Sequence, residues 1–141
     1  MGRSDFLYSK FLDHLKHAPT SCQDSLLRKV ADFVSSDDDD FSTGLAPMLL
    51  PDGQNTDSTC GKIGIWAWAA MRVLDYGLTL EGTDADNVTI SGHSRLGKTA
   101  LYTAMMDERF RFAFSNAAGC AGDSIAHGST GAKLAHIDRH L

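Results

Sequence analysis

The sequence lacks any long apolar run. Its longest, Ile63 to Met71, has nine residues, whereas a membrane-spanning helix needs about 20. The start, Met1 to Asp5, also lacks the apolar core of a signal peptide. We therefore expect no transmembrane segment, no membrane partner and, for the chain as written, a cytoplasmic location.

Blocks of lysine or arginine are also absent. The chain has 13 basic and 18 acidic residues, a net charge of −5, and the run Asp37 to Asp40 supplies four of the acids. Without a basic block to neutralise several phosphates, nucleic-acid binding is disfavoured. Consecutive aspartates cannot all converge on one calcium ion, so we interpret the run as a solvated stretch of charge.

Cysteines are few and unpaired in sequence. Cys22, Cys60 and Cys120 are far apart, odd in number and form no CxxC pair, which argues against a zinc site or a disulfide scaffold and favours incidental thiols. With 141 residues, 43% of them hydrophobic, the chain can bury one core without such staples. We treat residues 1–141 as one domain.

The first half of the chain gives mixed signals. Ser4 to Leu15 has helical spacing, while Ser21 to Val34 fits a helix whose end, Val30 to Val34, also fits a buried strand. Ser35 to Thr59 is rich in Asp, Ser, Gly and Pro, and we expect a long surface loop there.

Gly61 to Leu80 is the clearest expected helix. Its pattern places Trp66 in an apolar stripe of small residues suited to packing on a sheet, with Trp68 off the stripe. The opposite, solvent-facing side should carry Lys62, Arg72 and Asp75.

The second half alternates between strand and helix patterns. Val88 to Ser91 reads as a short strand ended by Gly92, Leu96 to Met106 as a helix, and Arg111 to Ser115 as a second strand, with a loop at Gly119 to Gly122. This order is typical of a parallel α/β sheet with right-handed crossovers.

The turn between that first strand and helix satisfies two motifs. As GxxxxGK[ST], Gly92 to Thr99 would be a phosphate loop, with Lys98 on the β and γ phosphates and Thr99 on magnesium. Around Ser94 the same turn fits a nucleophile elbow, in which a serine hydroxyl projects above the sheet. The second glycine of a usual GxSxG is displaced here by one position, to Gly97.

The surroundings weaken the nucleotide interpretation. The next expected strand ends in Ser115 and Asn116, without the acid that would hold magnesium. The loop interior, His93 to Leu96, is also bulkier than a phosphate loop usually tolerates.

Several blocks in order give a more specific signal than either motif. They are Asp40 to Ala46, Gly61 to Ala70 with Arg72 to Tyr76, Gly92 to Lys98, Asp107 to Phe110, and Ser115 to Asn116 with Gly119 to Cys120. In these blocks the sequence resembles the glucuronoyl esterase family of α/β-hydrolases, especially its bacterial members, over about residues 37–131; residues 1–27 are not recognisable.

The resemblance implies a fold and a set of roles. The fold would be a three-layer, α/β-hydrolase-like α/β domain, present as a partial parallel sheet with flanking helices. The family pattern GHSRxGK makes Ser94 the nucleophile of an acyl-enzyme mechanism, Arg95 a contributor to oxyanion stabilisation and Lys98 a contact to the sugar hydroxyls. The implied substrate is a carbohydrate ester, and no metal or organic cofactor is implied.

Other triad members are missing from their family places. His127, His136 and His140 follow the second expected strand, where the family does not place its base, and Ala117 stands where many members have a carboxylate. Asp123 is nearby and is a candidate for the acid. We therefore expect poor or no ester hydrolysis by this chain, and self-association through an unpaired sheet edge. A phosphate-loop protein and a noncatalytic α/β binding module remain alternatives.

Overall fold

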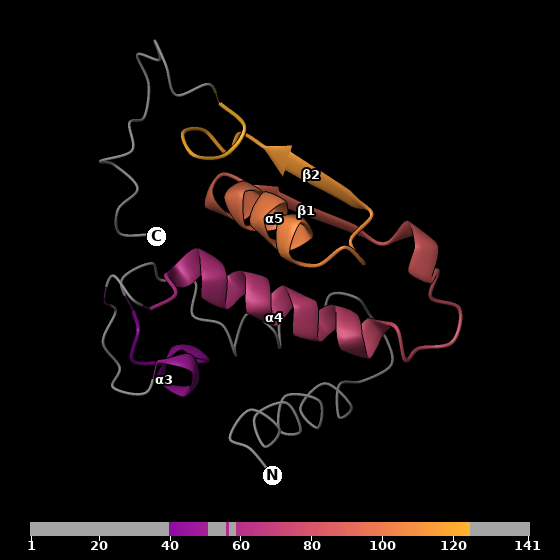
Figure 1. Cartoon of the computed structure of the whole chain (residues 1–141), viewed down its shortest axis with the longest axis horizontal. Helices are drawn as coiled ribbons and strands as arrows, with labels where there is room; N and C mark the ends of the chain where they lie inside the picture. The colour runs from indigo at the N-terminus through magenta and orange to yellow at the C-terminus, as the bar shows by residue number, and fades with distance from the viewer. Residues whose placement is uncertain (1–39, 51–55, 57–58, 125–141) are drawn as a thin grey trace.

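The computed structural model describes residues 40–50, 56 and 59–124. The patterns noted at Ser4 to Leu15 and Ser21 to Val34 lie outside these residues. In chain order the elements are α3 (Ala46–Leu49), α4 (Lys62–Gly77), the 3-10 turn η1 (Ala85–Asn87), β1 (Thr89–His93), α5 (Arg95–Met106) and β2 (Phe112–Asn116) (Figure 1). None of the helices in these ranges is long and apolar enough to cross a bilayer.

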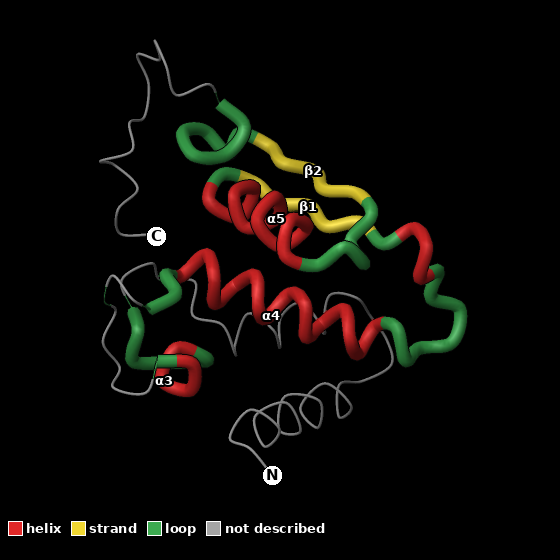
Figure 2. Tube along the Cα trace, in the orientation of Figure 1, coloured by secondary structure: helices red, strands yellow, loops and turns green. Residues whose placement is uncertain are grey.

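The two strands form a parallel pair connected through α5. Residues pair in register from Thr89 with Phe112 to His93 with Asn116, and α5 packs on both strands (Figure 2). The expected strand, helix and parallel strand are thus confirmed, and the described part is a small α/β unit. The first strand is longer than expected, because Gly92 and His93 continue it.

Two aromatic side chains are exposed on one face of this sheet. Ser115 and Gly92 lie beneath Gly97 of α5, so the alternation of a strand turns Phe112 and Phe114 to the other face. There these two rings are 55% and 72% exposed. Within the described residues each strand pairs along one edge only, and association through such an edge stays a prediction.

We expected helix α4 to pack on the sheet, but it packs mainly against α5 (Figure 1). Trp66 is buried, as predicted. The prediction for Lys62 was wrong, because this lysine is only 2% exposed. Its ammonium donates to the backbone oxygen of Asp40 and lies 4.9 Å from the ring centroid of Phe41, so long-range contacts override the helical pattern.

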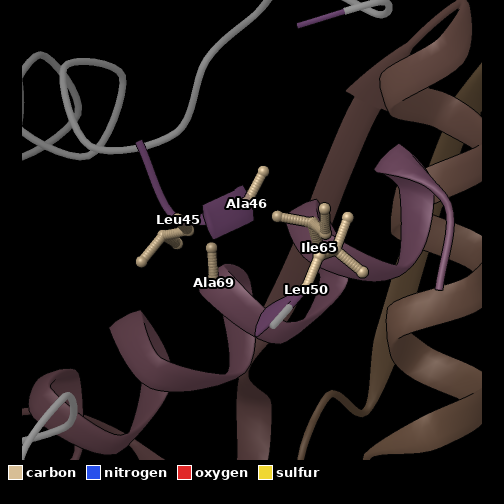
Figure 3. Close-up of a cluster of buried hydrophobic side chains, with 5 residues drawn as sticks. All are labelled: Leu45, Ala46, Leu50, Ile65 and Ala69. Carbon is tan, nitrogen blue, oxygen red and sulfur yellow. The ribbon is translucent and has the colours of Figure 1, made fainter. Parts of the chain in front are cut away.

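The expected surface loop over residues 35–59 also needs correction. Its middle forms α3, in which Pro47 occupies a first-turn position suited to its fixed φ. Side chains from α3 and its flanking residues pack with side chains of α4 into one apolar cluster (Figure 3). The cluster consists of Leu45, Ala46, Leu50, Ile65 and Ala69.

Candidate active site

Ser94 occupies a strained turn between a strand and a helix. β1 ends at His93 and α5 begins at Arg95, one residue earlier than expected, so Ser94 alone makes the connection. Its backbone has φ 55° and ψ −124°, a conformation that L residues rarely adopt and that costs about 1–3 kcal/mol. The serine therefore lies at the carboxyl end of a parallel strand, as the elbow interpretation predicted.

Backbone hydrogen bonds hold Ser94 in this conformation. Its N–H donates to the carbonyl of Asn116 at 2.8 Å, while its own carbonyl accepts from the N–H groups of Gly97 at 2.9 Å and Lys98 at 3.3 Å. The turn is thus joined to β2 on one side and to the first turn of α5 on the other. Surroundings of this kind let a structure keep local strain.

Two glycines make the turn sterically feasible. A Cβ on Gly92 would lie 2.0 Å from the backbone oxygen of Leu96, far inside van der Waals contact. A Cβ on Gly97 would lie 3.0 Å from Ser115 Oγ and 3.1 Å from Ala118 Cβ. The strand, the helix and the loop after β2 approach so closely that neither position accommodates a side chain without displacement.

The Ser94 side chain does not cap α5. Ser94 is exposed, and its hydroxyl makes no capping hydrogen bond to α5 although it occupies the N-cap position. Its strained backbone is therefore not explained by helix capping.

The same hydrogen bonds exclude a phosphate loop. Such a loop needs its N–H groups to converge on an anion, but those of Ser94, Gly97 and Lys98 already donate within the chain. Thr99, expected on magnesium in that interpretation, is buried, and its hydroxyl donates to the Arg95 carbonyl at 3.1 Å. The nucleotide-binding alternative is incompatible with this geometry.

Arg95 and Lys98 lie on either side of the start of α5. The Arg95 guanidinium carbon lies 5.7 Å from the ring centroid of Trp66 on α4. The Lys98 ammonium donates to the carbonyl of Ala118, in the loop after β2. Because an ammonium has three N–H donors, this bond leaves capacity for a ligand.

Similarity to known proteins agrees with this geometry. A family model described as glucuronyl esterase, fungi, matches residues 54–136, more than half of the chain and the whole of the turn described above. The chain belongs to the glucuronyl esterase family.

Two relatives are matched over part of their own length. Carbohydrate esterase MZ0003, from an unknown prokaryotic organism, is 36% identical over 78 residues, which are 55% of this chain and 18% of that protein. The 4-O-methyl-glucuronoyl methylesterase 1 of Wolfiporia cocos is 30% identical over 98 residues, 66% of this chain and 23% of that protein. The chain thus spans about a fifth of the length of these relatives.

Some blocks that carried the family resemblance make structural contacts instead of forming the elbow. Arg109 donates from Nη1 to Asp75 at 2.7 Å and from Nη2 to Asp107 at 2.6 Å, so it links the end of α5 to α4. Asp40 accepts hydrogen bonds from the N–H groups of Ser42 and Thr43 and closes the turn beneath Lys62.

Asp123, the guessed acid, fixes the loop after β2. Its carboxylate accepts from the N–H groups of Ala118 at 2.9 Å and Gly119 at 2.8 Å, and from Ser115 Oγ at 3.2 Å. These bonds lower the pKa of Asp123, that of the Ala118 N–H most strongly. Both of its oxygens are thus engaged within the loop.

No histidine is paired with Ser94 in the described residues. His93 lies next to Asn116, with 3.2 Å between His93 Nδ1 and Asn116 Nδ2. His127, His136 and His140 lie outside the described residues. At the place of the family carboxylate, Ala117 adopts φ 49°. Within those same ranges, no group of three or more His, Cys, Asp or Glu side chains could hold a metal ion, and Cys60 and Cys120 are free thiols.

Proposed function

We propose that this chain carries the nucleophile elbow of a serine carboxylic-ester hydrolase that acts on glucuronoyl esters of plant cell-wall polysaccharides. The observation that carries the proposal is the strained, exposed Ser94 between β1 and α5. The glucuronoyl ester is suggested by the Wolfiporia cocos relative, whose name specifies a 4-O-methyl-glucuronoyl methylester, and the cell-wall polysaccharide by the family resemblance.

In this mechanism Ser94 Oγ attacks the ester carbonyl carbon and passes its proton to a base. The resulting oxyanion would be stabilised by Arg95, which lies next to the nucleophile; one such donor is commonly worth about 3 kcal/mol. Collapse of the intermediate expels the alcohol and leaves an acyl group on Ser94, which water then removes as the free sugar acid. Lys98 would bind hydroxyl groups of the sugar ring.

The arrangement also suggests that the chain itself hydrolyses esters only slowly. The one histidine among the described residues, His93, is beside Asn116, and Ala117 has no group to orient a base. A hydrolase without a complete triad retains only about 10³ to 10⁴-fold acceleration over water. We therefore propose an elbow that reacts with strong acylating or phosphonylating reagents but hydrolyses esters slowly.

A fluorophosphonate probe tests the nucleophile separately from turnover. In this reaction a bond forms between Ser94 Oγ and phosphorus, the P–F bond breaks, and fluoride and the hydroxyl proton leave to solvent. Mass spectrometry should locate the label on Ser94, and Ser94→Ala should abolish it. Ser91→Ala, which removes an exposed serine from the adjacent strand β1, should leave labelling unchanged. An unlabelled Ser94 would favour a noncatalytic binding module.

Hydrolysis of a benzyl glucuronate ester tests the second half of the proposal. We expect a rate well below that of ordinary enzymes, in which kcat is about 1 to 10³ per second. Turnover in that range, lost in Ser94→Ala, would contradict the incomplete site. It would mean that a histidine outside the described residues, such as His127 or His136, completes it.

A further inference from the structure

The contact between Trp66 and Arg95 joins the core of the molecule to the elbow. Trp66 lies on α4 and is only 6% exposed, so its ring is fixed by packing. Arg95 is the first residue of α5 and is half-buried. Its guanidinium carbon lies 5.7 Å from the Trp66 ring centroid, within the range of a cation–π interaction.

This contact matters because an arginine side chain is long and flexible. A donor stabilises an oxyanion best when it is already in place before the charge develops. A buried indole attracts the guanidinium electrostatically and also covers part of its stem, which reduces the number of accessible rotamers. Trp66 thus provides, from a neighbouring helix, a restraint on Arg95 at the start of α5.

We propose that Trp66 is a positioning residue that holds the Arg95 guanidinium beside Ser94. The proposal rests on the proposed function, since it assumes that Arg95 stabilises charge on a group bonded to Ser94. Trp66 itself does not touch the reacting atoms. It acts through Arg95 alone, which distinguishes it from a residue that merely supports the packing of α4 on α5.

A second pair on the same helix provides an internal control. Arg72 lies over Trp68 at 5.4 Å from the ring centroid, so its cation–π geometry is similar. This pair is i, i+4 within α4, however, and makes no link to the elbow. Trp68→Leu should therefore leave the reactivity of Ser94 unchanged.

The test is a double-mutant cycle on the rate of fluorophosphonate labelling at Ser94. We expect Arg95→Ala to slow labelling about a hundredfold, by loss of one oxyanion donor, and Trp66→Leu to slow it about fivefold, by loss of the cation–π restraint. In the Arg95→Ala background, Trp66→Leu should have no further effect. Trp66→Phe fills the core and keeps an aromatic face, so we expect it to restore most of the rate.

The outcomes separate the two proposals. An equal slowing by Trp66→Leu with and without Arg95 would overturn the positioning role, as would a Trp66→Phe variant that is folded yet as slow as Trp66→Leu. If Trp66→Leu fails to fold, the same cycle is measured with Trp66→Phe. We then expect Trp66→Phe to slow labelling about twofold when Arg95 is present and not at all when it is absent. A wild-type chain unlabelled at Ser94 would overturn the proposed function, and this inference with it.

Discussion

The two ends of α5 are stabilised by different physics. At its start, the close approach of Gly92 to Leu96 and the strained backbone of Ser94 define the turn. At its end, Asp107 lies at the C-cap, where the helix dipole disfavours a negative charge, and Arg109 neutralises it. The first end therefore depends on shape and the second on charge.

This difference predicts how each end responds to perturbation. A side chain added at Gly92, beside the start of α5, cannot be accommodated by a rotamer change of its neighbours, because the nearest atoms that it meets are backbone. Charge removed at the end leaves partly exposed groups that water can solvate. Mutations at the elbow should consequently have the larger effects, and salt should modulate only the ion pairs.

The largest effect is expected for Gly92→Ala. The new methyl group would overlap the Leu96 carbonyl, and we expect the free energy of unfolding to fall by about 3 kcal/mol. Gly77→Ala is the matched control, since nothing lies within 4 Å of a Cβ there; it should raise stability by about 0.5 kcal/mol. Urea titration measures both, and equal effects would contradict the steric account of the elbow.

The next effect separates strain from chemistry at Ser94. Glycine adopts positive φ without penalty, so Ser94→Gly should be about 1 kcal/mol more stable than Ser94→Ala. Both variants lack the hydroxyl and should escape phosphonate labelling. If Ser94→Ala were the more stable in denaturant titrations, the backbone of this turn would not be strained.

A smaller effect is expected when the charges at the other end of α5 are removed. Arg109→Leu should lower stability by about 1 kcal/mol at pH 7, whereas Arg111→Leu, at an exposed neighbour, should change it little. Arg109 lowers the pKa of Asp107 in the folded chain. The stability that this ion pair contributes is therefore fully present above the pKa of an unfolded aspartate, about 3.9. It is lost as the pH falls through the lower pKa of Asp107 in the folded chain.

Denaturation curves of both variants at pH 7 and at pH 3, in low and high salt, check this prediction. The difference between wild type and Arg109→Leu should shrink at low pH and in high salt. A difference independent of both would show that Arg109 acts through packing instead.

The smallest effect is local, in the loop after β2. Asp123→Ala removes the acceptor for the N–H groups of Ala118 and Gly119, so hydrogen exchange at these two amides should accelerate while the helices keep their protection. Asp86→Ala, at another exposed aspartate, should leave them unchanged. Unaltered exchange in Asp123→Ala would mean that other contacts, such as the Lys98 hydrogen bond to Ala118 and the backbone bonds to the Gly119 carbonyl, hold the loop.

Local patterns predicted the elbow well, because its determinants are adjacent in sequence. Gly92, Ser94 and Gly97 act on one another within one strand and one helical turn, and the strands beside them differ from expectation only at their ends. The partner acid and base could not be predicted in the same way, since those side chains come from distant parts of a hydrolase.

The misses share one physical cause. Lys62 was assigned to solvent from its place on a helical wheel, yet Asp40 and Phe41, more than 20 residues earlier, surround its ammonium. The contact between Trp66 and Arg95 likewise joins two helices that are separated in sequence. Periodicity describes one element at a time, so contacts between elements stay invisible to it.

The buried Lys62 also makes undocking of the first turn of α4 measurable by chemical modification. Amine-reactive reagents modify lysines at rates set by access. The ammonium of Lys62, a residue that is only 2% exposed, is protected as long as α4 stays docked on the turn at Asp40. Lys98, half-buried in the first turn of α5, would be modified sooner. The ratio of the two modification rates therefore measures how often the first turn of α4 undocks. Mass spectrometry can determine it without any substrate.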